Sequence, residues 1–209
     1  MTLAEQLEAL QRKGFSAKQA RVIVLIREGA TILFRQWPES FILYGGANLV
    51  LFHESVRHSA DLDLHLQGDL PSADKVAAIL GQELDPLVKL LQQSPLEVKV
   101  FRSDQDLLKI GISSDGVALF TVDLNRMGSV IESGIEERIL EGLGTPDTAN
   151  VRFVSGNLLL LQKAEAFLLR RFVKARDAYD VRFLLDRNAT LDGNLHDHLA
   201  DLLLGSIDG

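Results

Sequence analysis

The sequence predicts an α+β fold, in which helices flank a mixed β-sheet and a helical segment follows at the C-terminal end. Three observations predict it. Residues 61–66 alternate strictly between polar residues and leucine, as in a strand with one buried face. More strand-like segments follow within residues 96–124, and after residue 155 the apolar spacing becomes helical. We therefore expect a core of residues 1–154 with N-terminal helices, and a helical segment of residues 155–209 packed on it.

The first part of the chain is expected to form two helices, a strand and a short third helix. Residues 2–13 and 16–29 each begin with a Thr or Ser suited to cap a helix, and Lys-Gly-Phe separates them. The apolar run 41–44 ends at a glycine pair, which indicates a buried strand entering a turn. Residues 47–54 are expected to form a brief helix after that turn.

The middle of the chain supplies most of the predicted sheet. Residues 73–93 are amphipathic and helical in spacing, with Pro86 as an interruption. Strands are expected at 96–102, 107–112 and 117–124, and Ser-Ser-Asp-Gly between the last two is a hairpin signal.

The last part of the chain is less regular before it becomes helical. Residues 128–152 contain several glycines and one proline, so short edge strands and a loop are both open. Helices are expected near 156–172, 175–187 and 195–204.

The composition is that of an ordinary globular protein: 209 residues, 46% of them hydrophobic and 24% charged. A net charge of −7 argues against a protein that coats nucleic acid by bulk electrostatics, but it leaves room for a local basic site. The absence of cysteine excludes disulfides, thiolate metal sites and a cysteine nucleophile. The first residues lack the layout of a signal peptide, and no apolar run approaches the ~20 residues of a membrane span. We therefore expect a cytoplasmic protein with no membrane partner.

Two carboxylates on the predicted strand 61–66 point to a cation. Asp61 and Asp63 are two residues apart, so both side chains leave the same face, roughly 6–7 Å apart at Cα. Like charges at this spacing repel unless something positive lies between them. Magnesium prefers such oxygen ligands and leaves room for substrate phosphates. Asp123 is the best candidate for a third carboxylate, since it lies on the polar face of the strand 117–124.

The glycine pair before the short helix predicts a phosphate site. Gly45 and Gly46 let the backbone come close to an anion, and the helix that follows directs free N–H groups and its positive dipole end toward it. Asn48 can add a side-chain donor, and Arg57 and Ser59 precede the two aspartates closely enough to help.

Each of these features has a plainer interpretation when taken alone. A glycine pair is usually a turn, an alternating strand usually has one solvated face, and a single strand aspartate such as Asp123 is usually a surface residue. Their order and spacing together favour a site that binds a metal ion and nucleotide phosphates.

The same residues carry a resemblance to a known family. The pattern of a glycine pair, a short helix, and Arg-x-Ser-x-Asp-x-Asp, followed by a later strand acid, resembles the nucleotidyltransferase fold. More narrowly, it resembles the AbiEii/AbiGii toxin family of type IV toxin–antitoxin systems. The matching residues of the first motif are Gly45, Gly46, Leu49, Arg57, Ser59, Asp61 and Asp63.

A second motif supports the narrower resemblance, which spans residues 41 to about 187. Its residues, in order, are Lys163, Arg170 or Arg171, Arg176, Asp177 and Asp180. The resemblance implies that Lys163 reaches a triphosphate, that Arg176 helps to bind the nucleotide, and that Asp180 acts on the acceptor hydroxyl. The residues alone also allow a solvated helix face, because Asp177 and Asp180 are helix neighbours and exposed ion pairs contribute only ~0.3–0.5 kcal/mol each.

Three functions follow from these observations. The first is a nucleotidyltransferase that uses Mg²⁺, with Mn²⁺ as an alternative, on Asp61, Asp63 and Asp123, and moves a nucleotide from a nucleoside triphosphate to RNA, such as tRNA, or to protein. The resemblance implies a toxin component with a cognate antitoxin protein as partner. The second is a non-catalytic nucleotide- or partner-binding module of the same fold. The third is a metal-dependent phosphodiesterase, which explains the carboxylates but leaves Gly45 and Lys163 without a role.

Overall fold

The computed structural model forms two units, each compact by its own contacts. The first, called the sheet unit, comprises Met1–Val130 and Glu137–Phe153, and the second, the helical unit, comprises Ile131–Glu136 and Val154–Gly209. The residues that the structure describes are 2–69, 71–91, 95–126, 134–142, 148–170, 172, 174–191, 193, 196, 197 and 200.

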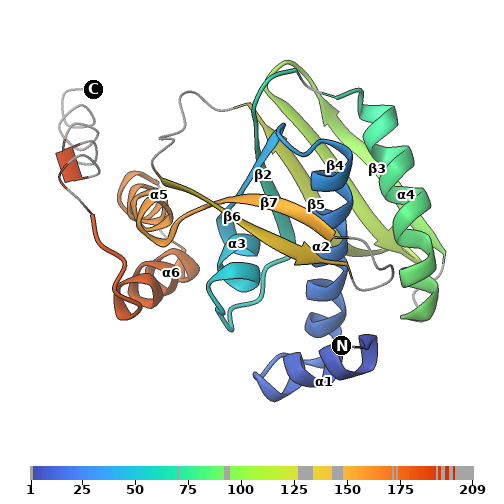
Figure 1. Ribbon diagram of the computed structural model, residues 1–209, viewed down its shortest axis with the longest axis horizontal. Helices are drawn as coiled ribbons and strands as arrows, with labels where there is room; N and C mark the ends of the chain where they lie inside the picture. Colours follow the sequence, from blue (N-terminus) through green and yellow to red (C-terminus); the bar gives the residue numbers. More distant parts are fainter. Residues whose placement is uncertain are drawn as a thin grey trace. The chain divides into compact units, whose positions relative to one another are not determined.

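A mixed sheet forms the centre of the sheet unit (Figure 1). Its strand order is β3-β4-β5-β2-β1-β7-β6. The strands are β1 (Phe41–Tyr44), β2 (Asp61–Leu66), β3 (Leu96–Ser103), β4 (Leu107–Ser114), β5 (Val117–Asn125), β6 (Ile135–Glu141) and β7 (Thr148–Val154). Strand β2 pairs antiparallel with β1 and parallel with β5, so it lies near the middle of the sheet.

Among the residues that the structure describes, four named helices belong to the sheet unit and two to the helical unit. They are α1 (Leu3–Arg12), α2 (Ala17–Gln36), α3 (Gly45–Phe52), α4 (Ala73–Leu90), α5 (Gly156–Leu169) and α6 (Ala175–Asp186). The caps predicted for the first two helices are present, since Thr2 and Ser16 each form a capping box with the third residue of the helix. Helix α2 is longer than the predicted segment 16–29, because its last two turns bury Ile32, Leu33 and Phe34 completely or nearly so.

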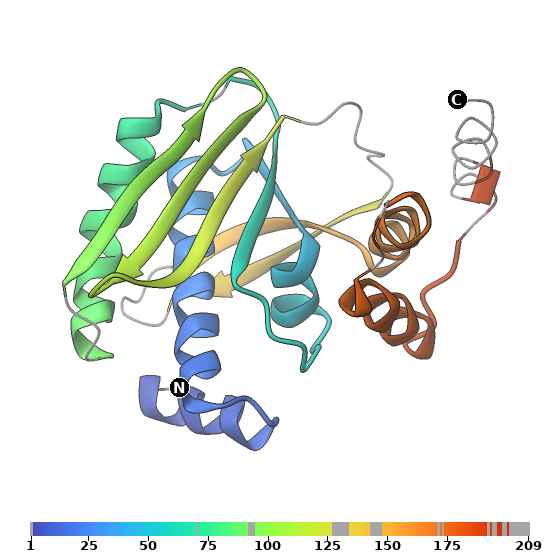
Figure 2. The same cartoon turned by 180° about the vertical axis from the view of Figure 1, so that it is seen from behind.

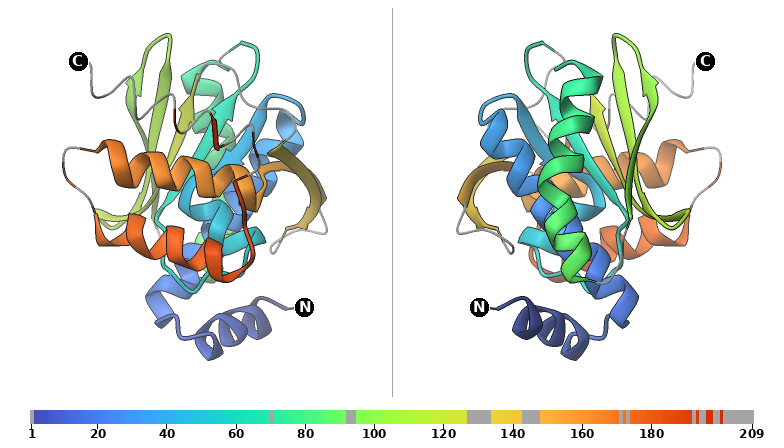
Figure 3. Two further views of the ribbon diagram at one scale, coloured as in Figure 1. Left: turned by 90° about the vertical axis from the view of Figure 1, so that its left-hand side faces the viewer. Right: turned by 90° about the vertical axis from the view of Figure 1, so that its right-hand side faces the viewer.

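Helices α2 and α4 cover one face of the sheet. In Figure 1 they lie in front of β3, β4 and β5, in Figure 2 these strands lie in front of them, and Figure 3 shows α4 alongside β3 and β4. The buried residues Leu62 and Val122 point to this face, and a Cβ on Gly29 of α2 would lie 3.4 Å from the ring of Phe120. The opposite face of β3, β4, β5 and β2, called the open face, carries the polar side chains of these strands.

The structure shows which conformations the hairpin segment and residues 128–152 adopt. The hairpin joining β4 to β5 is confirmed, with Asp115 and Gly116 both in the left-handed region at φ of 49° and 71°. Residues 128–152, left open between strands and a loop, contain β6 and β7, and β7 is an internal strand that runs parallel to β1. The helix expected at 195–204 lies largely outside the described residues.

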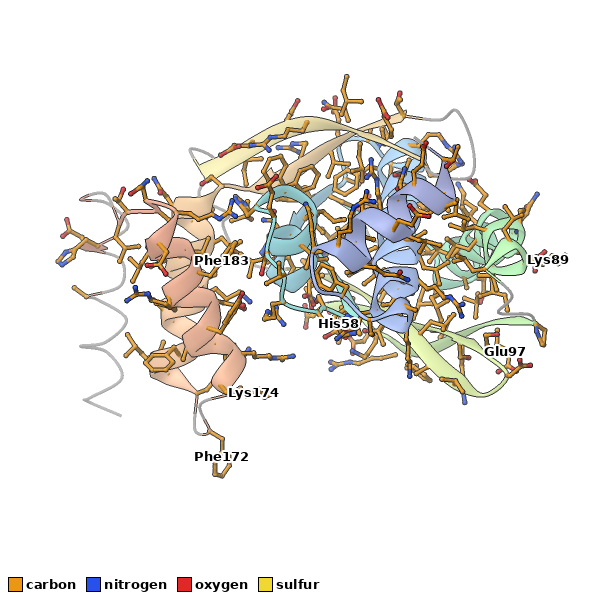
Figure 4. All side chains as sticks on the ribbon, turned by 90° about the horizontal axis from the view of Figure 1, so that it is seen from below. His58, Lys89, Glu97, Phe172, Lys174 and Phe183 are labelled. Carbon is orange, nitrogen blue, oxygen red and sulfur yellow. The ribbon has the colours of Figure 1, made fainter. Side chains whose placement is uncertain are left out.

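The helical unit is built on a helical hairpin. Helix α5 buries the run 158–161, and α6 buries Leu184. Figure 4 labels Phe183 on α6, and Phe172 and Lys174 in the segment before it. Among the described helices of the whole chain, none is long and apolar enough to cross a membrane.

Candidate active site

The two aspartates of β2 lie on the open face of the sheet. Asp61 and Asp63 are each partly exposed, whereas Leu62 and Leu64 between and beyond them are completely buried. The strict alternation in the sequence therefore has the physical cause that was expected. One face of β2 packs against the core and the other presents carboxylates.

Asp123 lies directly beside Asp63 on the next strand. The register of the parallel pair β2–β5 places Asp63 opposite Asp123, on the same open face. Lys109 of β4 is opposite Asp123 in turn, and its Nζ lies 2.9 Å and 2.6 Å from the two carboxylate oxygens. The ammonium group therefore offsets part of the negative charge that the three aspartates bring together.

Lys109 was missed by the sequence reasoning. In Leu-Leu-Lys-Ile, Lys109 stands between two apolar residues that face the core, so strand alternation directs its side chain to the open face. The identity of its partner depends on strand register, which no local pattern in the sequence specifies.

Asp61 has a hydroxyl partner from the same neighbouring strand. Thr121 Oγ1 donates a hydrogen bond of 2.9 Å to Asp61 Oδ1. The register continues across the sheet, so that Gly111 of β4, Thr121 of β5 and Asp61 of β2 form one row. Asp61 is thus held in place by a neutral donor, while Asp123 is held by a cation.

The glycine pair forms the first turn of α3. The helix begins at Gly45, so the predicted start near residue 47 is two residues late. Gly45 has φ of +72°, and a Cβ on it would overlap the carboxylate of Asp63. A Cβ on Gly46 would overlap the guanidinium of Arg57 and the hydroxyl of Ser59. Glycine is therefore required at both positions for the side chains of β2 and its preceding loop to approach the helix N-terminus.

The loop before β2 places cationic and hydroxyl groups at that turn. Arg57 Nη1 donates to the carbonyl of His58 at 3.1 Å, and Ser59 Oγ donates to the carbonyl of Asp61 at 3.4 Å. Both side chains thereby stay beside Gly46. Asn48 is different, because it is completely buried within α3. Its role as a donor to the nucleotide stays a prediction.

An aromatic pair adjoins Asp63 on the side of β1. Tyr44 is opposite Asp63 in the antiparallel register, and its ring stacks on His65 with centroids 3.6 Å apart. Burial, followed by the charge of Asp63, raises the pKa of Tyr44, so its hydroxyl is protonated at neutral pH and accepts a 2.9 Å hydrogen bond from Asn125. Burial lowers the pKa of His65 to about 4, so its imidazole is neutral. Tyr44 was also missed by the sequence reasoning.

The helical unit contains the other predicted site residues. Lys163 Nζ lies 2.9 Å from Asp180 Oδ2, and the exposed fractions of the two side chains are 13% and 0%. Arg170 Nη1 lies 2.7 Å from Asp177 Oδ2, which is also buried. The alternative interpretation as a solvated helix face is therefore wrong for both carboxylates, whereas Arg176 is exposed. Arg171, the alternative to Arg170 in the second motif, lies outside the described residues.

The open face offers ligands that suit a divalent cation, although they do not form a complete coordination shell. Asp61 and Asp63 supply hard carboxylate oxygens beside the space that a Cβ on Gly45 would fill. Among the described residues no group of three or more His, Asp or Glu side chains is arranged to hold a metal ion. Both oxygens of Asp123 are bonded to Lys109. The two β2 carboxylates thus fit an ion that takes its remaining ligands from substrate phosphates and water.

Comparisons with known proteins agree on the fold. Residues 31–206 match the family described as nucleotidyl transferase AbiEii toxin, type IV TA system. MenT4, a nucleotidyltransferase toxin from Mycobacterium tuberculosis, has a TM-score of 0.54 and 16% identity, over 93% of this chain and 67% of its own. This likeness confirms the predicted nucleotidyltransferase-like α+β fold.

Two further solved structures have lower similarity scores. JHP933 from Helicobacter pylori has a TM-score of 0.48 and 14% identity, over 88% of this chain and 66% of its own. An antigenic nucleotidyltransferase-like protein from Paracoccidioides brasiliensis has a TM-score of 0.46 and 17% identity, over 91% of this chain and 89% of its own. A search of curated protein sequences found no match.

Proposed function

Because this chain belongs to the AbiEii family of type IV toxin nucleotidyltransferases, we propose that it transfers a nucleotide from a nucleoside triphosphate to an acceptor hydroxyl. One observation carries the proposal: the Asp63 carboxylate occupies the space beside the Gly45 backbone. A phosphate bound at the first turn of α3 is thereby next to the carboxylates of β2. Phosphoryl-transfer sites need this juxtaposition, because their catalysis consists mostly of positioning and charge stabilisation.

The phosphates of the donor are proposed to bind at the N-terminus of α3. The first peptide N–H groups of a helix have no intrahelical acceptor, and the helix dipole favours an anion there. Gly45 and Gly46 bring no side chain of their own to that end, and Arg57 and Ser59 lie beside Gly46. A guanidinium and a hydroxyl at this place supply charge and hydrogen bonds to phosphate oxygens.

Asp61 and Asp63 are proposed to hold Mg²⁺, or Mn²⁺ in its place, with Asp123 as the third carboxylate. When bound, such an ion neutralises negative charge on the phosphate oxygens of the donor. Thr121 orients the Asp61 carboxylate through its 2.9 Å hydrogen bond. Lys109 holds Asp123 on the same face and limits the repulsion among the aspartates when no cation is present.

The reaction itself forms one bond and breaks one. The acceptor oxygen bonds to the α-phosphorus, the bond from that phosphorus to the bridging oxygen of the β-phosphate breaks, and pyrophosphate leaves. Lys163 is proposed to contact the triphosphate and Arg176 the nucleotide. Asp180, the residue that the resemblance assigns to the acceptor hydroxyl, is proposed to take its proton. Its ion pair with Lys163 also fixes the position of the ammonium group.

RNA, such as tRNA, is the proposed acceptor, with a protein hydroxyl as the alternative. A cognate antitoxin protein is the proposed partner, since the family belongs to type IV toxin–antitoxin systems. The cytoplasm, where nucleoside triphosphates and RNA are available, is the proposed location.

The proposal is tested by following labelled nucleotide. The purified full chain is incubated with Mg²⁺, each α-labelled nucleoside triphosphate in turn, and total RNA. We expect label to move to RNA with the wild type and not with the double variant Asp61→Ala, Asp63→Ala. The matched control is Asp69→Ala, Asp74→Ala, which removes two exposed carboxylates elsewhere in the sheet unit and should leave transfer unchanged.

The other outcomes separate the rival functions. Label on protein in place of RNA would keep the chemistry and change the acceptor. Triphosphate binding without transfer would favour the non-catalytic module, and metal-dependent cleavage of RNA without label transfer would favour the phosphodiesterase. Transfer that persists in the Asp61→Ala, Asp63→Ala variant would contradict the assigned site.

A further inference from the structure

We propose that Phe101 and Lys99 of β3 form a stacking platform for a nucleobase of an RNA acceptor strand. This inference rests on the proposed function and adds the place at which the acceptor binds. It concerns residues of the open face that have no part in the carboxylate site or in the phosphate site.

Phe101 is exposed in a way that core packing does not explain. The residue is 57% exposed and lies near the C-terminal end of β3, an edge strand of the sheet. The strand pairing shifts between Val100 and Arg102, so that Phe101 lies at a β-bulge, a feature that changes the direction of a side chain. The ring is held against Gly111 of β4, where a Cβ would overlap it. Part of the ring therefore covers a glycine, and more than half of the residue's surface remains exposed.

A cation accompanies the exposed ring. Lys99 Nζ lies 5.8 Å from the centroid of the Phe101 ring. The next residues on this side of β3 and β4, Glu97 and Ser113, are polar. Ser113 Oγ lies 3.5 Å from Glu97 Oε2. Among the described residues, these neighbours on β3 and β4 are polar, so they do not line a groove for a hydrophobic peptide. An aromatic ring beside a lysine instead matches single-stranded nucleic acid, whose bases stack and whose phosphates are negative.

The position of the ring relative to the aspartates follows from the strand register. Phe101 covers Gly111, and Gly111, Thr121 and Asp61 form one row across β4, β5 and β2. Neighbouring strands are about 4.8 Å apart, so the platform is roughly 10 Å from Asp61 across the sheet. One or two nucleotides span that distance.

The geometry of the reaction places the acceptor on this side. Gly45 follows β1, which flanks β2 on one side, while β5, β4 and β3 lie in sequence on the other side. In phosphoryl transfer the attacking and leaving oxygens are roughly in line through the phosphorus. If pyrophosphate leaves from the helix N-terminus at Gly45, the acceptor approaches from the side of β5. Phe101 lies on that side, on β3, three strands beyond β2, and its ring reaches over Gly111 of β4, two strands beyond β2.

The first test measures RNA binding directly, without transfer. Single-stranded RNA with a free 3′ hydroxyl is titrated into the full-length wild type, Phe101→Ala, Phe101→Leu and Phe101→Tyr. We expect Phe101→Ala and Phe101→Leu to weaken binding ~5- to 150-fold, the range that the loss of one stacked base produces, and Phe101→Tyr to retain it. The control is Ile139→Ala, which removes the apolar side chain of a more exposed residue, 72% exposed, on β6 at the opposite edge of the sheet.

A phenylalanine over a cross-strand glycine can also serve the sheet alone. Thermal unfolding of each variant separates the two roles, because a purely structural role would lower Tm and leave RNA affinity per folded molecule unchanged. A fluorescent variant gives a second measurement. Stacking on Phe101→Trp should quench its emission, saturably, when RNA is added, and the same addition should leave Ile139→Trp unchanged.

The outcomes distinguish this inference from the proposed function. Equal RNA affinity in wild type and Phe101→Ala, or quenching of Phe101→Trp by nucleoside triphosphate or by a peptide acceptor in place of RNA, would overturn the platform. Phe101-dependent RNA binding in a protein that transfers no nucleotide would support the platform and overturn the proposed function.

Discussion

Strand β2 of the sheet unit and helix α6 of the helical unit each carry a pair of aspartates on one face, and the surroundings of the two pairs differ. Asp61 and Asp63 are two apart on strand β2, and Asp177 and Asp180 are three apart on helix α6. Both spacings place the side chains of a pair on the same side of their element, because strands repeat every two residues and helices bring residues three apart together. In the sequence the two pairs look equivalent.

In the structure the two pairs differ in the burial of their carboxylates and in the groups that contact them. In the helical unit each carboxylate is buried and has its own cation, Lys163 for Asp180 and Arg170 for Asp177. On β2 both carboxylates are partly exposed, and Asp61 accepts a hydrogen bond from a neutral hydroxyl. A buried carboxylate fixes the position of the cation beside it, and removal of either partner alone is destabilising. Asp61 and Asp63 are partly exposed, so a cation from solvent can reach them, as the proposed function requires.

The largest expected effect concerns the accessible pair. We expect Asp63→Asn to lower nucleotidyl transfer by more than ~100-fold, because several kcal/mol of charge stabilisation are lost and each ~1.4 kcal/mol is tenfold in rate. Thermal stability should stay within a few degrees of wild type, because the side chain is partly exposed. Initial rates and Tm are measured on the same preparations. A variant with wild-type rates would remove Asp63 from the site.

The next effect concerns the buried pair, and it should be seen in stability. Lys163→Ala leaves the Asp180 carboxylate buried without its cation, which costs ~3–5 kcal/mol in the free energy of unfolding. Urea denaturation measures this loss. The double variant Lys163→Met, Asp180→Leu should regain most of the stability and still lack transfer activity if the pair has a catalytic role. A loss below ~1 kcal/mol in Lys163→Ala would mean that water screens the pair.

Gly45 links the accessible pair to the helix N-terminus. Gly45→Ala should lose ~1–2 kcal/mol of stability for its left-handed backbone and, in addition, displace the Asp63 carboxylate and slow transfer at least about tenfold. Gly116→Ala is the matched control, because Gly116 has φ of +71° and no atom within 4 Å of the added Cβ. Stability should fall in both variants, and activity only in the first. Equal activity in the two would show that the approach of Asp63 to Gly45 is not needed.

Lys109 tests whether the open face carries unbalanced charge. Lys109→Met removes the cation that is bonded to Asp123 and exposes the repulsion between Asp123 and Asp63, at a cost of ~0.2–1 kcal/mol. A double-mutant cycle with Asp123→Asn isolates this coupling. Because Mg²⁺ can take the place of the ammonium group, it should raise the Tm of Lys109→Met more than that of wild type. The reverse order would argue against a cation at these carboxylates.

The smallest effect sets the baseline for the helical unit. Arg182 pairs with Asp186 on the surface of α6, where the two side chains are 78% and 56% exposed. We expect Arg182→Ala to change the free energy of unfolding by no more than ~0.5 kcal/mol, as is usual for exposed pairs four residues apart. Urea denaturation in parallel with Lys163→Ala makes the comparison. An effect as large as that of Lys163→Ala would mean that burial is not what separates these ion pairs.

The predictions from local patterns were confirmed where the pattern is compatible with only one local structure. The alternation of residues 61–66 gave a strand with buried leucines, and Ser-Ser-Asp-Gly gave a hairpin. The predictions were incomplete where tertiary packing determines the ends of a helix. Helix α2 continues past residue 29 because residues 30–36 contain no glycine or proline and bury apolar side chains. Helix α3 begins at Gly45, where φ is +72° and a Cβ would overlap the Asp63 carboxylate, so the position of this start depends on a contact with a distant strand.

The sequence by itself determined the fold class, the faces on which the aspartates lie, and the order of the glycine pair, Arg57, Ser59 and the carboxylates. These properties depend on periodicity and spacing, which are local. Only the tertiary structure decided that Lys109 is bonded to Asp123, that Asp180 is buried against Lys163, and that Phe101 is exposed over Gly111. Each of these depends on strand register or on helix packing, which join residues distant in the chain and follow from the burial of the whole core.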